Sequence, residues 1–350
     1  MFESLPIIKI FFLTAASFVV TIAWTPALTH ILYRFKLGKR IRDAGEAPVY
    51  AKLHEKKSGT PTMGGVLIWL TTLVLALVVY ALHRWTSIEL FDTVNFLTRP
   101  ETLLPLGALV AAAIVGLVDD LFNIRQKGAH GGGFSMRHKL LIYVAIAIVG
   151  AWWFVVKLDW TVLHIPFVGN LDIGLWYVPI FLFVIVATTF SVNETDGLDG
   201  LAGGVLLTSF GAYSIIAFLQ GRTDLAAFCG VIMGSLLAFL WFNIPPARFI
   251  MGDTGSMALG TTLGIVAMLT NSALILPVIG FVFVFESLSV IVQLTYRRAT
   301  GGRKLLRSSP IHHHLEAVGW PESKIVMRFW VVSGVMAVLG VMLYLLDTTL

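Results

Sequence analysis

The sequence predicts an all-α polytopic integral membrane protein with about ten transmembrane helices. Of its 350 residues, 57% are hydrophobic and only 13% are charged, whereas a soluble domain carries about 25% charged residues. The mean hydropathy is +0.84. Apolar runs of about 18 or more residues recur along the chain, and each is long enough to cross the hydrocarbon core as a helix. An ordinary water-soluble domain is therefore excluded.

The apolar runs predict one membrane domain, 1–350, with neither an internal repeat nor a separate soluble domain. The first run follows Glu3 and Lys9 and lacks a short apolar core with a small-residue cleavage site, so we expect it to be retained rather than cleaved as a signal peptide. The ten spans are expected at 11–33, 62–82, 103–121, 139–156, 175–192, 201–219, 225–242, 254–270, 272–295 and 327–346.

The basic residues predict the orientation of these spans. Of the 25 Lys and Arg residues, twenty fall in one alternating set of connections and five in the other. Cytoplasmic loops carry the excess of Lys and Arg, so the first set is expected inside and both termini outside, in the periplasm. The predicted cytoplasmic loops are about 34–61, 121–138, 193–200, 243–253 and 296–326.

The net charge of +5 does not predict a nucleic-acid partner. Membrane topology and anionic lipids already favour basic cytoplasmic loops, and basic segments interleaved with aromatic residues are absent from the sequence. The single cysteine, Cys229, lies in an apolar span, where it is expected to be a small buried hydrophobic residue.

Four short polar segments interrupt the apolar chain on the predicted cytoplasmic side. Asp119 and Asp120 end the third span, where two adjacent carboxylates repel each other and are costly to desolvate. A divalent cation or a role in proton transfer would offset that repulsion. The alternative is a solvated helix end, although acidic residues at a helix C-terminus gain nothing from the helix dipole.

Asn193, Asp196 and Asp199 follow the fifth span at three-residue spacing, which places side chains on one face if the segment is helical. Their oxygen atoms suit a hydrated Mg²⁺ or the hydroxyl groups of a nucleotide sugar. Gly197 and Gly200 permit close approach of a ligand or of another backbone segment. A plain Asx-turn is the alternative.

Asn243 and the Gly252-Asp253-Thr254-Gly255 segment join the seventh and eighth spans. Asp253 could cap the following helix, and a helix N-terminus also attracts phosphate. The segment from Lys57 to Gly65, which includes Thr62, resembles a phosphate-binding turn without being a Walker sequence; Gly and Pro also simply begin helices.

Three consecutive histidines, His312, His313 and His314, do not have the spacing of paired zinc ligands. We expect their imidazoles to reach a phosphate or an amide instead. Glu286 and Gln293 lie seven residues apart within the ninth span, so both a functional role and a structural hydrogen bond between spans stay open for them.

Together these segments resemble the phospho-N-acetylmuramoyl-pentapeptide transferase family, within the polyprenyl-phosphate sugar-1-phosphate transferase superfamily. The resemblance covers nearly the whole chain in order. It is carried by the 57–65 segment, Asp119–Asp120, the N-x-T-D-G-L-D-G-L-A sequence at 193–202, M-G-D-T-G-S at 251–256, P-I-H-H-H at 310–314 and G-W-P-E at 319–322.

The resemblance implies Mg²⁺-dependent transfer of phospho-N-acetylmuramoyl-pentapeptide from a uridine diphosphate carrier to undecaprenyl phosphate, and it suggests a homodimer. It implies Asp253 as the metal ligand and as one of three catalytic residues, with Asp119 or Asp120 as base or orienter of the lipid phosphate. The residues it implies for substrate binding are Lys57, Thr62, Asn193, Asp196, Asp199, Asn243, Gly252, His312, His313 and His314.

Three positions depart from the family pattern, and one of them is Glu194, which stands where an apolar residue is common. Asn123 replaces a lysine three residues after the second aspartate, so Arg125 or Lys127 would have to supply that charge. Ile250 replaces a phenylalanine expected to stack on uracil. Two functional alternatives stay open: an N-acetylglucosamine-1-phosphate transferase of the same superfamily, and a proton-coupled transporter or lipid flippase. The acidic residues gather at span ends rather than at the bilayer midplane, which disfavours the second.

Overall fold

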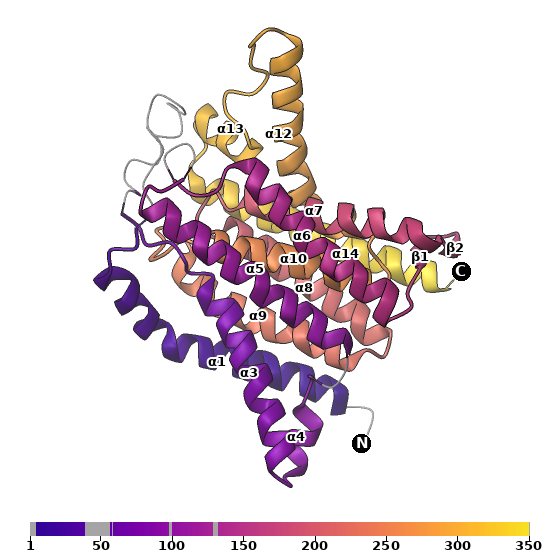
Figure 1. Cartoon of the computed structure of the whole chain (residues 1–350). Coiled ribbons are helices and arrows are strands. Elements are labelled where there is room, and N and C mark those ends of the chain that lie inside the picture. The colour runs from indigo at the N-terminus through magenta and orange to yellow at the C-terminus, as the bar shows by residue number, and fades with distance from the viewer. Residues whose placement is uncertain (1–4, 39–56, 58, 98–99, 129–131, 350) are drawn as a thin grey trace.

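The computed structural model describes residues 5–38, 57, 59–97, 100–128 and 132–349, which form a bundle of long helices with one small sheet (Figure 1). The long helices are α1 (Leu5–Arg34), α3 (Val66–Trp85), α5 (Pro100–Ile124), α6 (Met136–Trp152), α7 (Tyr177–Thr195), α8 (Leu201–Leu219), α9 (Thr223–Asn243), α10 (Asp253–Leu269), α12 (Phe281–Ala299) and α14 (Glu322–Thr349). The shorter elements are α4 (Glu89–Val94), η3 (Trp153–Lys157), β1 (Val162–Ile165), β2 (Gly169–Asp172), η4 (Gly174–Trp176), α11 (Leu276–Ile279) and α13 (Ile311–Val318).

Eight helical segments in the described part of the chain are long and apolar enough to cross a membrane. They coincide with eight of the ten predicted spans and correspond to α1, α3, α5, α6, α7, α8, α9 and α14. The prediction of a helical, multi-pass membrane protein is therefore confirmed.

The two other predicted spans have a different character. The eighth, 254–270, forms α10, a helix of 17 residues whose side chains from Thr254 to Leu269 are all buried by neighbouring helices. The ninth, 272–295, was predicted as one helix, and this is wrong. A turn at Gly280 separates the four-residue α11 from α12, which continues to Ala299 and projects away from the bundle (Figure 1).

The predicted loops also contain helical structure. The 296–326 segment is not one continuous loop, because α13 begins after Pro310 and ends at Gly319, whose φ of +105° suits the residue that follows a helix. Helix α7 extends to Thr195, so it includes the start of the predicted 193–200 loop. Much of the predicted 34–61 loop (39–56 and 58) lies outside the described residues.

The all-α prediction missed the β1–β2 hairpin, whose antiparallel register pairs Val162 with Asp172 and Ile165 with Gly169. Four-residue strands are too short for their alternation to stand out from neighbouring apolar spans. The hairpin is fastened to the end of α14, where Asp347 contacts His164 Nε2 at 2.5 Å and accepts a hydrogen bond from the Phe167 amide at 2.6 Å. Hairpin and C-terminus thus mark one end of the bundle (Figure 1, right).

At the opposite end, α5 and α10 approach so closely that their backbones touch. A Cβ atom on Gly116 would overlap the carbonyl group of Asp253, so only glycine fits there. Small residues permit such close contact between membrane helices. The contact brings the last turns of α5, which carry Asp119 and Asp120, beside the first residues of α10.

Candidate active site

Asp119 and Asp253 lie on two sides of the ammonium group of Lys139. Lys139 Nζ is 2.9 Å from Asp119 Oδ2 and also forms an ion pair with Asp253 Oδ2. The three residues come from the end of α5, the first residue of α10 and the first turn of α6. Asp119 is only 1% exposed, and buried charges of this kind are tolerated when they are paired. The result is a compact cluster of two carboxylates and one cation.

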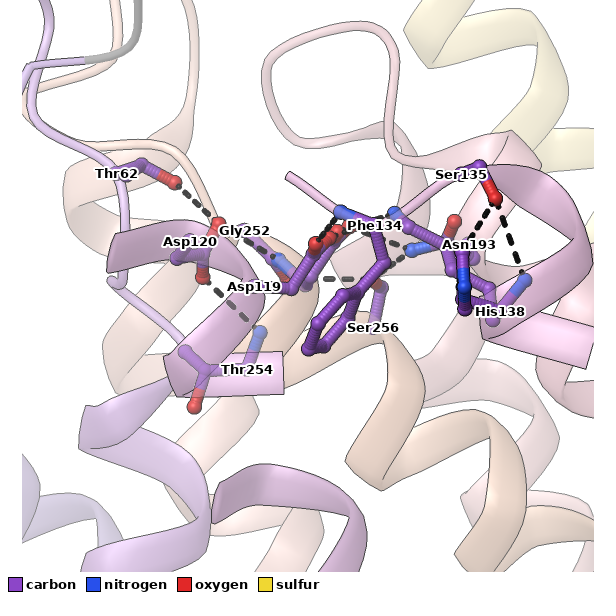
Figure 2. A network of polar contacts seen from close by, with 12 residues as sticks. Thr62, Asp119, Asp120, Phe134, Ser135, His138, Asn193, Gly252, Thr254 and Ser256 are labelled. Atoms are coloured by element: carbon purple, nitrogen blue, oxygen red, sulfur yellow. Dashed lines mark hydrogen bonds and ion pairs between the residues drawn. The ribbon is translucent and has the colours of Figure 1, made fainter. Parts of the chain in front are cut away.

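The start of α6 holds Lys139 in this position. Ser135 is the N-cap of α6; its hydroxyl accepts a hydrogen bond from the His138 amide at 3.5 Å and contacts His138 Nδ1 at 2.6 Å. The preceding amide, of Phe134, donates to Asp119 Oδ1 (Figure 2). A side-chain N-cap of this kind stabilises the first turn of a helix. The Ser135 cap therefore holds the start of the helix that carries Lys139, and the neighbouring Phe134 amide holds the Asp119 carboxylate that Lys139 contacts.

Asn193 holds the second carboxylate. Its Nδ2 atom donates to Asp253 Oδ1 at 2.7 Å and to Ser256 Oγ at 2.8 Å, one turn further along α10. Both oxygen atoms of Asp253 therefore have a partner, Asn193 on one and Lys139 on the other. The predicted shared face of Asn193, Asp196 and Asp199 requires a helix through all three residues. Helix α7 ends at Thr195, so that face does not form, and Asn193 bonds to Asp253 instead.

Asp120 has a different environment from Asp119. Its two oxygen atoms accept hydrogen bonds from the backbone amides of Asp253 at 3.2 Å and Thr254 at 3.1 Å (Figure 2). These are the first amides of α10, which have no partner within the helix. The N-cap residue itself is Gly252, which has no side chain with which to accept these hydrogen bonds. Asp120 thus caps α10 from another helix, and Asp253 is not the cap.

Gly252 lies where several backbone and side-chain groups meet. Its φ is +75°, and an added Cβ would come within 2.5 Å of Thr62 Oγ1 and 2.6 Å of Asp120 Oδ2. Thr62 donates to Asp120 Oδ1 at 3.3 Å, and the Gly252 amide donates to Asp196 Oδ2 at 3.1 Å. Both the conformation and the crowding require glycine at this position.

A second ionic cluster contains Lys57, Asp199 and Glu322. Lys57 Nζ lies 2.8 Å from Asp199 Oδ1 and also pairs with Glu322 in the first turn of α14. Glu322 accepts a hydrogen bond from the Asp199 amide at 2.8 Å. Burial by itself lowers the pKa of the Lys57 amine, but the adjacent carboxylates of Asp199 and Glu322 outweigh it and raise that pKa above its ordinary value. Lys57 is therefore firmly protonated.

Asn243 fastens the loop that precedes α10. Its side chain accepts from the Gly200 amide at 2.9 Å and donates to the Phe249 carbonyl at 2.8 Å. Phe249 is fully buried, with its ring centroid 5.9 Å from that of Phe239 and 6.0 Å from that of Phe242. It belongs to the core, so it does not supply the aromatic surface that Ile250 lacks.

The three histidines have three different partners. Nδ1 of His312 lies 2.8 Å from Glu286 Oε2, and both side chains are fully buried. Nδ1 of His313 lies 2.8 Å from Glu316, and Nδ1 of His314 accepts from the Arg307 amide at 3.1 Å. A Cβ on Gly197 would overlap the His312 ring. His312 and His313 therefore pack against the 193–200 segment, whereas His314 contacts the chain before α13.

The structure thus brings most of the predicted residues to one end of the bundle, in two ionic clusters. The hydrogen bond from the Gly252 amide to Asp196 links the segments that carry them. Sequence reasoning missed Lys139 and Glu322 as members of the site. In the sequence Lys139 is only the first residue of the predicted 139–156 span, although a lysine in the first turn of an apolar helix was a usable signal. Arg125 and Lys127, predicted to replace the charge absent at Asn123, are exposed, and the cation between the carboxylates is Lys139.

Asp119 and Asp253 are the residues that could hold a divalent cation. Within residues 5–38, 57, 59–97, 100–128 and 132–349, no group of three or more His, Cys, Asp or Glu side chains is arranged to hold one. Mg²⁺ usually takes one or two protein carboxylates together with water and substrate phosphates. The carboxylates of Asp119 and Asp253 already bind one cation, the ammonium group of Lys139. The donor set therefore fits Mg²⁺ and does not form a closed protein cage.

Two models of known protein families match the segments that carry the site residues. A family model described as glycosyl transferase family 4 matches residues 102–271. A second, described as phospho-N-acetylmuramoyl-pentapeptide-transferase signature 1, matches residues 57–68. The first contains Asp119, Lys139, Asn193 and Asp253, and the second contains Lys57.

Curated relatives match over almost the entire chain. A phospho-N-acetylmuramoyl-pentapeptide-transferase of Chloroflexus aurantiacus is 39% identical over 346 residues, covering 95% of this chain and 89% of the relative. Proteins of the same name from Geobacillus kaustophilus and Listeria monocytogenes are 41% and 38% identical. Each alignment covers 93% of this chain and 95% of the relative.

Proposed function

Because the chain belongs to the phospho-N-acetylmuramoyl-pentapeptide-transferase family, we propose that it transfers phospho-N-acetylmuramoyl-pentapeptide from its uridine diphosphate carrier to undecaprenyl phosphate. The products are lipid I and UMP, in the first membrane step of peptidoglycan synthesis. The observation that supports this most directly is the convergence of Asp119, Lys139 and Asp253 from three helices at one end of a multi-pass bundle.

The reaction exchanges one phosphoanhydride bond for another. An oxygen of the lipid phosphate attacks the phosphorus that bears the sugar, the bond from that phosphorus to the UMP oxygen breaks, and UMP leaves with the electron pair. Two anionic reactants must approach each other, so catalysis depends on positioning and charge neutralisation. We favour direct attack, because positioning both phosphates at the Asp119–Lys139–Asp253 cluster is sufficient without a covalent intermediate.

Asp119 is the carboxylate that orients the lipid phosphate in this proposal. Both oxygens of Asp120 receive backbone amides of α10, which commits Asp120 to holding Asp253 in place. Asp119 instead faces Lys139, a side chain that can pair with phosphate oxygens when substrate arrives. The roles of the adjacent aspartates therefore differ, with Asp119 acting on substrate and Asp120 positioning Asp253.

Asp253, together with Asp119, would hold Mg²⁺. The ion would neutralise charge on the phosphates as the transferred group moves between them. Asn193 keeps Asp253 oriented through its 2.7 Å hydrogen bond. The uridine nucleotide is proposed to bind at the neighbouring cluster that contains Lys57 and Asp199, with Asp196 and His313 as further binding residues.

The proposed setting is the bacterial cytoplasmic membrane. The carrier nucleotide is polar and is made in the cytoplasm, so the site end of the bundle is placed on the cytoplasmic side, in agreement with the excess of basic residues in the predicted inside loops. The hairpin end then faces the exterior. A homodimer is part of the same proposal and is tested by the mass of the protein in lipid nanodiscs.

The experiment that tests the function measures UMP release by purified protein from two nucleotide sugars, each with undecaprenyl phosphate. Release from UDP-N-acetylmuramoyl-pentapeptide, abolished by EDTA and restored by Mg²⁺, supports the proposal. Asp253→Asn is expected to lower turnover by about two to three orders of magnitude, while Asn271→Asp, at the other end of the bundle, serves as control.

Two results would overturn the assignment. Preferential release of UMP from UDP-N-acetylglucosamine would place the protein in the other branch of the superfamily. Lipid movement that continues under EDTA, with no UMP formed from either nucleotide sugar, would identify a transporter or flippase instead.

A further inference from the structure

Two cations on α14 converge on one aromatic ring near the site end of the bundle. Lys324 Nζ lies 4.9 Å and Arg328 Cζ lies 4.5 Å from the centroid of the Trp320 ring. Both cationic side chains are exposed. Among the described residues neither forms an ion pair with a carboxylate. The indole face attracts each cation, but it supplies no full negative charge to offset two positive ones.

The same face of α14 continues as an apolar stripe. Steps of four and three residues lead from Lys324 and Arg328 to Val331, Val335 and Val338, which are 68%, 55% and 69% exposed. Such spacing keeps side chains on one side of a helix. The opposite side of α14 is buried against the bundle, through Ile325, Ser333, Ala337 and Gly340. The face has two cations at one end and branched apolar side chains along the rest.

The length of α14 places the two parts at different depths in a bilayer. Its 28 residues span about 42 Å, whereas the hydrocarbon core is about 30 Å thick. When the helix is centred in that core, Val331 to Val338 lie in hydrocarbon and Lys324 lies at its boundary. Arg328, one turn inside, extends back toward Trp320, as long cationic side chains near helix ends do.

We propose that Trp320, Lys324 and Arg328 form a binding site for the headgroup of an anionic phospholipid, whose acyl chains lie along the valine stripe. The phosphodiester supplies the negative charge that the two cations lack, and the indole ring lies at the interfacial level that tryptophan favours. Charge repulsion disfavours a second copy of the chain at this face. A membrane dimer with its twofold axis along the bilayer normal would pair the α14 helices in parallel and oppose four cations.

This lipid would lie next to the proposed active site. Glu322, which pairs with Lys57 and with the Asp199 amide, is two residues from both Trp320 and Lys324. Trp320 follows α13, which carries His312 and His313. A bound headgroup therefore stabilises the junction between α13 and α14, from which Glu322 joins the cluster of Lys57 and Asp199.

The test measures lipid retention and not turnover, so its failure and the failure of the proposed function are distinguishable. Full-length protein is placed in phosphatidylcholine nanodiscs with and without phosphatidylglycerol, released, and weighed by native mass spectrometry. Wild-type protein is expected to retain one phosphatidylglycerol that Lys324→Gln/Arg328→Gln loses. Neutralising the cations should weaken retention about fivefold each and about 25-fold together.

Matched variants distinguish lipid binding at this site from a general effect of positive charge on the protein surface. Arg303→Gln/Lys304→Gln removes two exposed cations from the same basic stretch and should retain lipid as the wild type does. Trp320→Phe keeps the packing but weakens the attraction for both cations, so it should give an intermediate loss. Equal retention of phosphatidylglycerol by the Lys324/Arg328 variant and the wild type would overturn the proposal. So would equal retention of phosphatidylcholine, displacement by equimolar undecaprenyl phosphate, or loss of a dimer in the variant.

Discussion

Lys139 Nζ lies 2.9 Å from Asp119 Oδ2, although a polar loop separates the helices that carry the two residues. The same ammonium group pairs with Asp253 on a third helix. One cation therefore connects α5, α6 and α10 at the position where the phosphates are proposed to react.

Lys139→Met is expected to lower the turnover number for UMP release about 100-fold, because it removes a positive charge aimed at the reacting phosphates. It also leaves two neighbouring carboxylates without the ammonium group between them. The measurement is steady-state UMP release at saturating Mg²⁺. Lys127→Met, an exposed lysine before the same helix, is the matched control and should stay within about twofold of wild type. A Lys139→Met enzyme as active as this control would contradict the assigned position of the site.

Asp119→Asn and Asp120→Asn should differ in stability even though both lower activity. Asp120 accepts the first amides of α10, so its loss of charge weakens a helix cap and should destabilise the protein by about 1–2 kcal/mol. Asp119→Asn is not expected to have that effect on α10. Thermal melting in detergent, with UMP release measured in parallel, compares the two variants. Identical melting temperatures would show that Asp120 does not stabilise α10.

The Lys57 cluster predicts a pH dependence. Because the pKa of Lys57 is raised in the folded protein, the ion pair contributes its full stability below the pKa of the unfolded chain and loses it as pH rises through the folded pKa. The melting-temperature difference between wild type and Lys57→Met should therefore be constant from about pH 6 to about pH 9 and shrink above about pH 10.5. A difference that changes near neutral pH would instead indicate a depressed pKa.

Glu286 and His312 are expected to act as one unit. Both are fully buried and 2.8 Å apart, so either single change replaces the contact between a carboxylate and an imidazole by a contact with a neutral amide. Glu286→Gln and His312→Gln should each reduce turnover, and the double variant should cost no more than the worse single one. The pairwise coupling is measured by a double-mutant cycle on UMP release. Additive losses would show that the pair does not function together.

The structure and the comparison with relatives confirm predictions that depended on patterns within continuous segments. Apolar runs located eight spans, and the order of polar motifs identified the family. Both kinds of pattern lie within short stretches of the chain. A membrane span is one continuous apolar run, because the backbone groups of a helix in hydrocarbon must bond within the helix. A motif is likewise a few neighbouring residues. The turn at Gly280 was missed because the apolar character of the chain continues across it while the helix is interrupted. The β1–β2 hairpin was missed because its strands have only four residues each.

By itself, the sequence determined a multi-pass helical membrane protein, its family, and most of the polar residues from which the proposed active site is built, but not Lys139 or Glu322. Only the tertiary structure decided how that set divides. Asp119 pairs with Lys139, whereas the adjacent Asp120 caps α10, and Phe249 is buried in the core rather than open to a nucleotide. The reason is that side-chain partners come from helices far apart in the chain. Their positions depend on packing contacts, such as that of Gly116 against the Asp253 backbone, which no local pattern encodes.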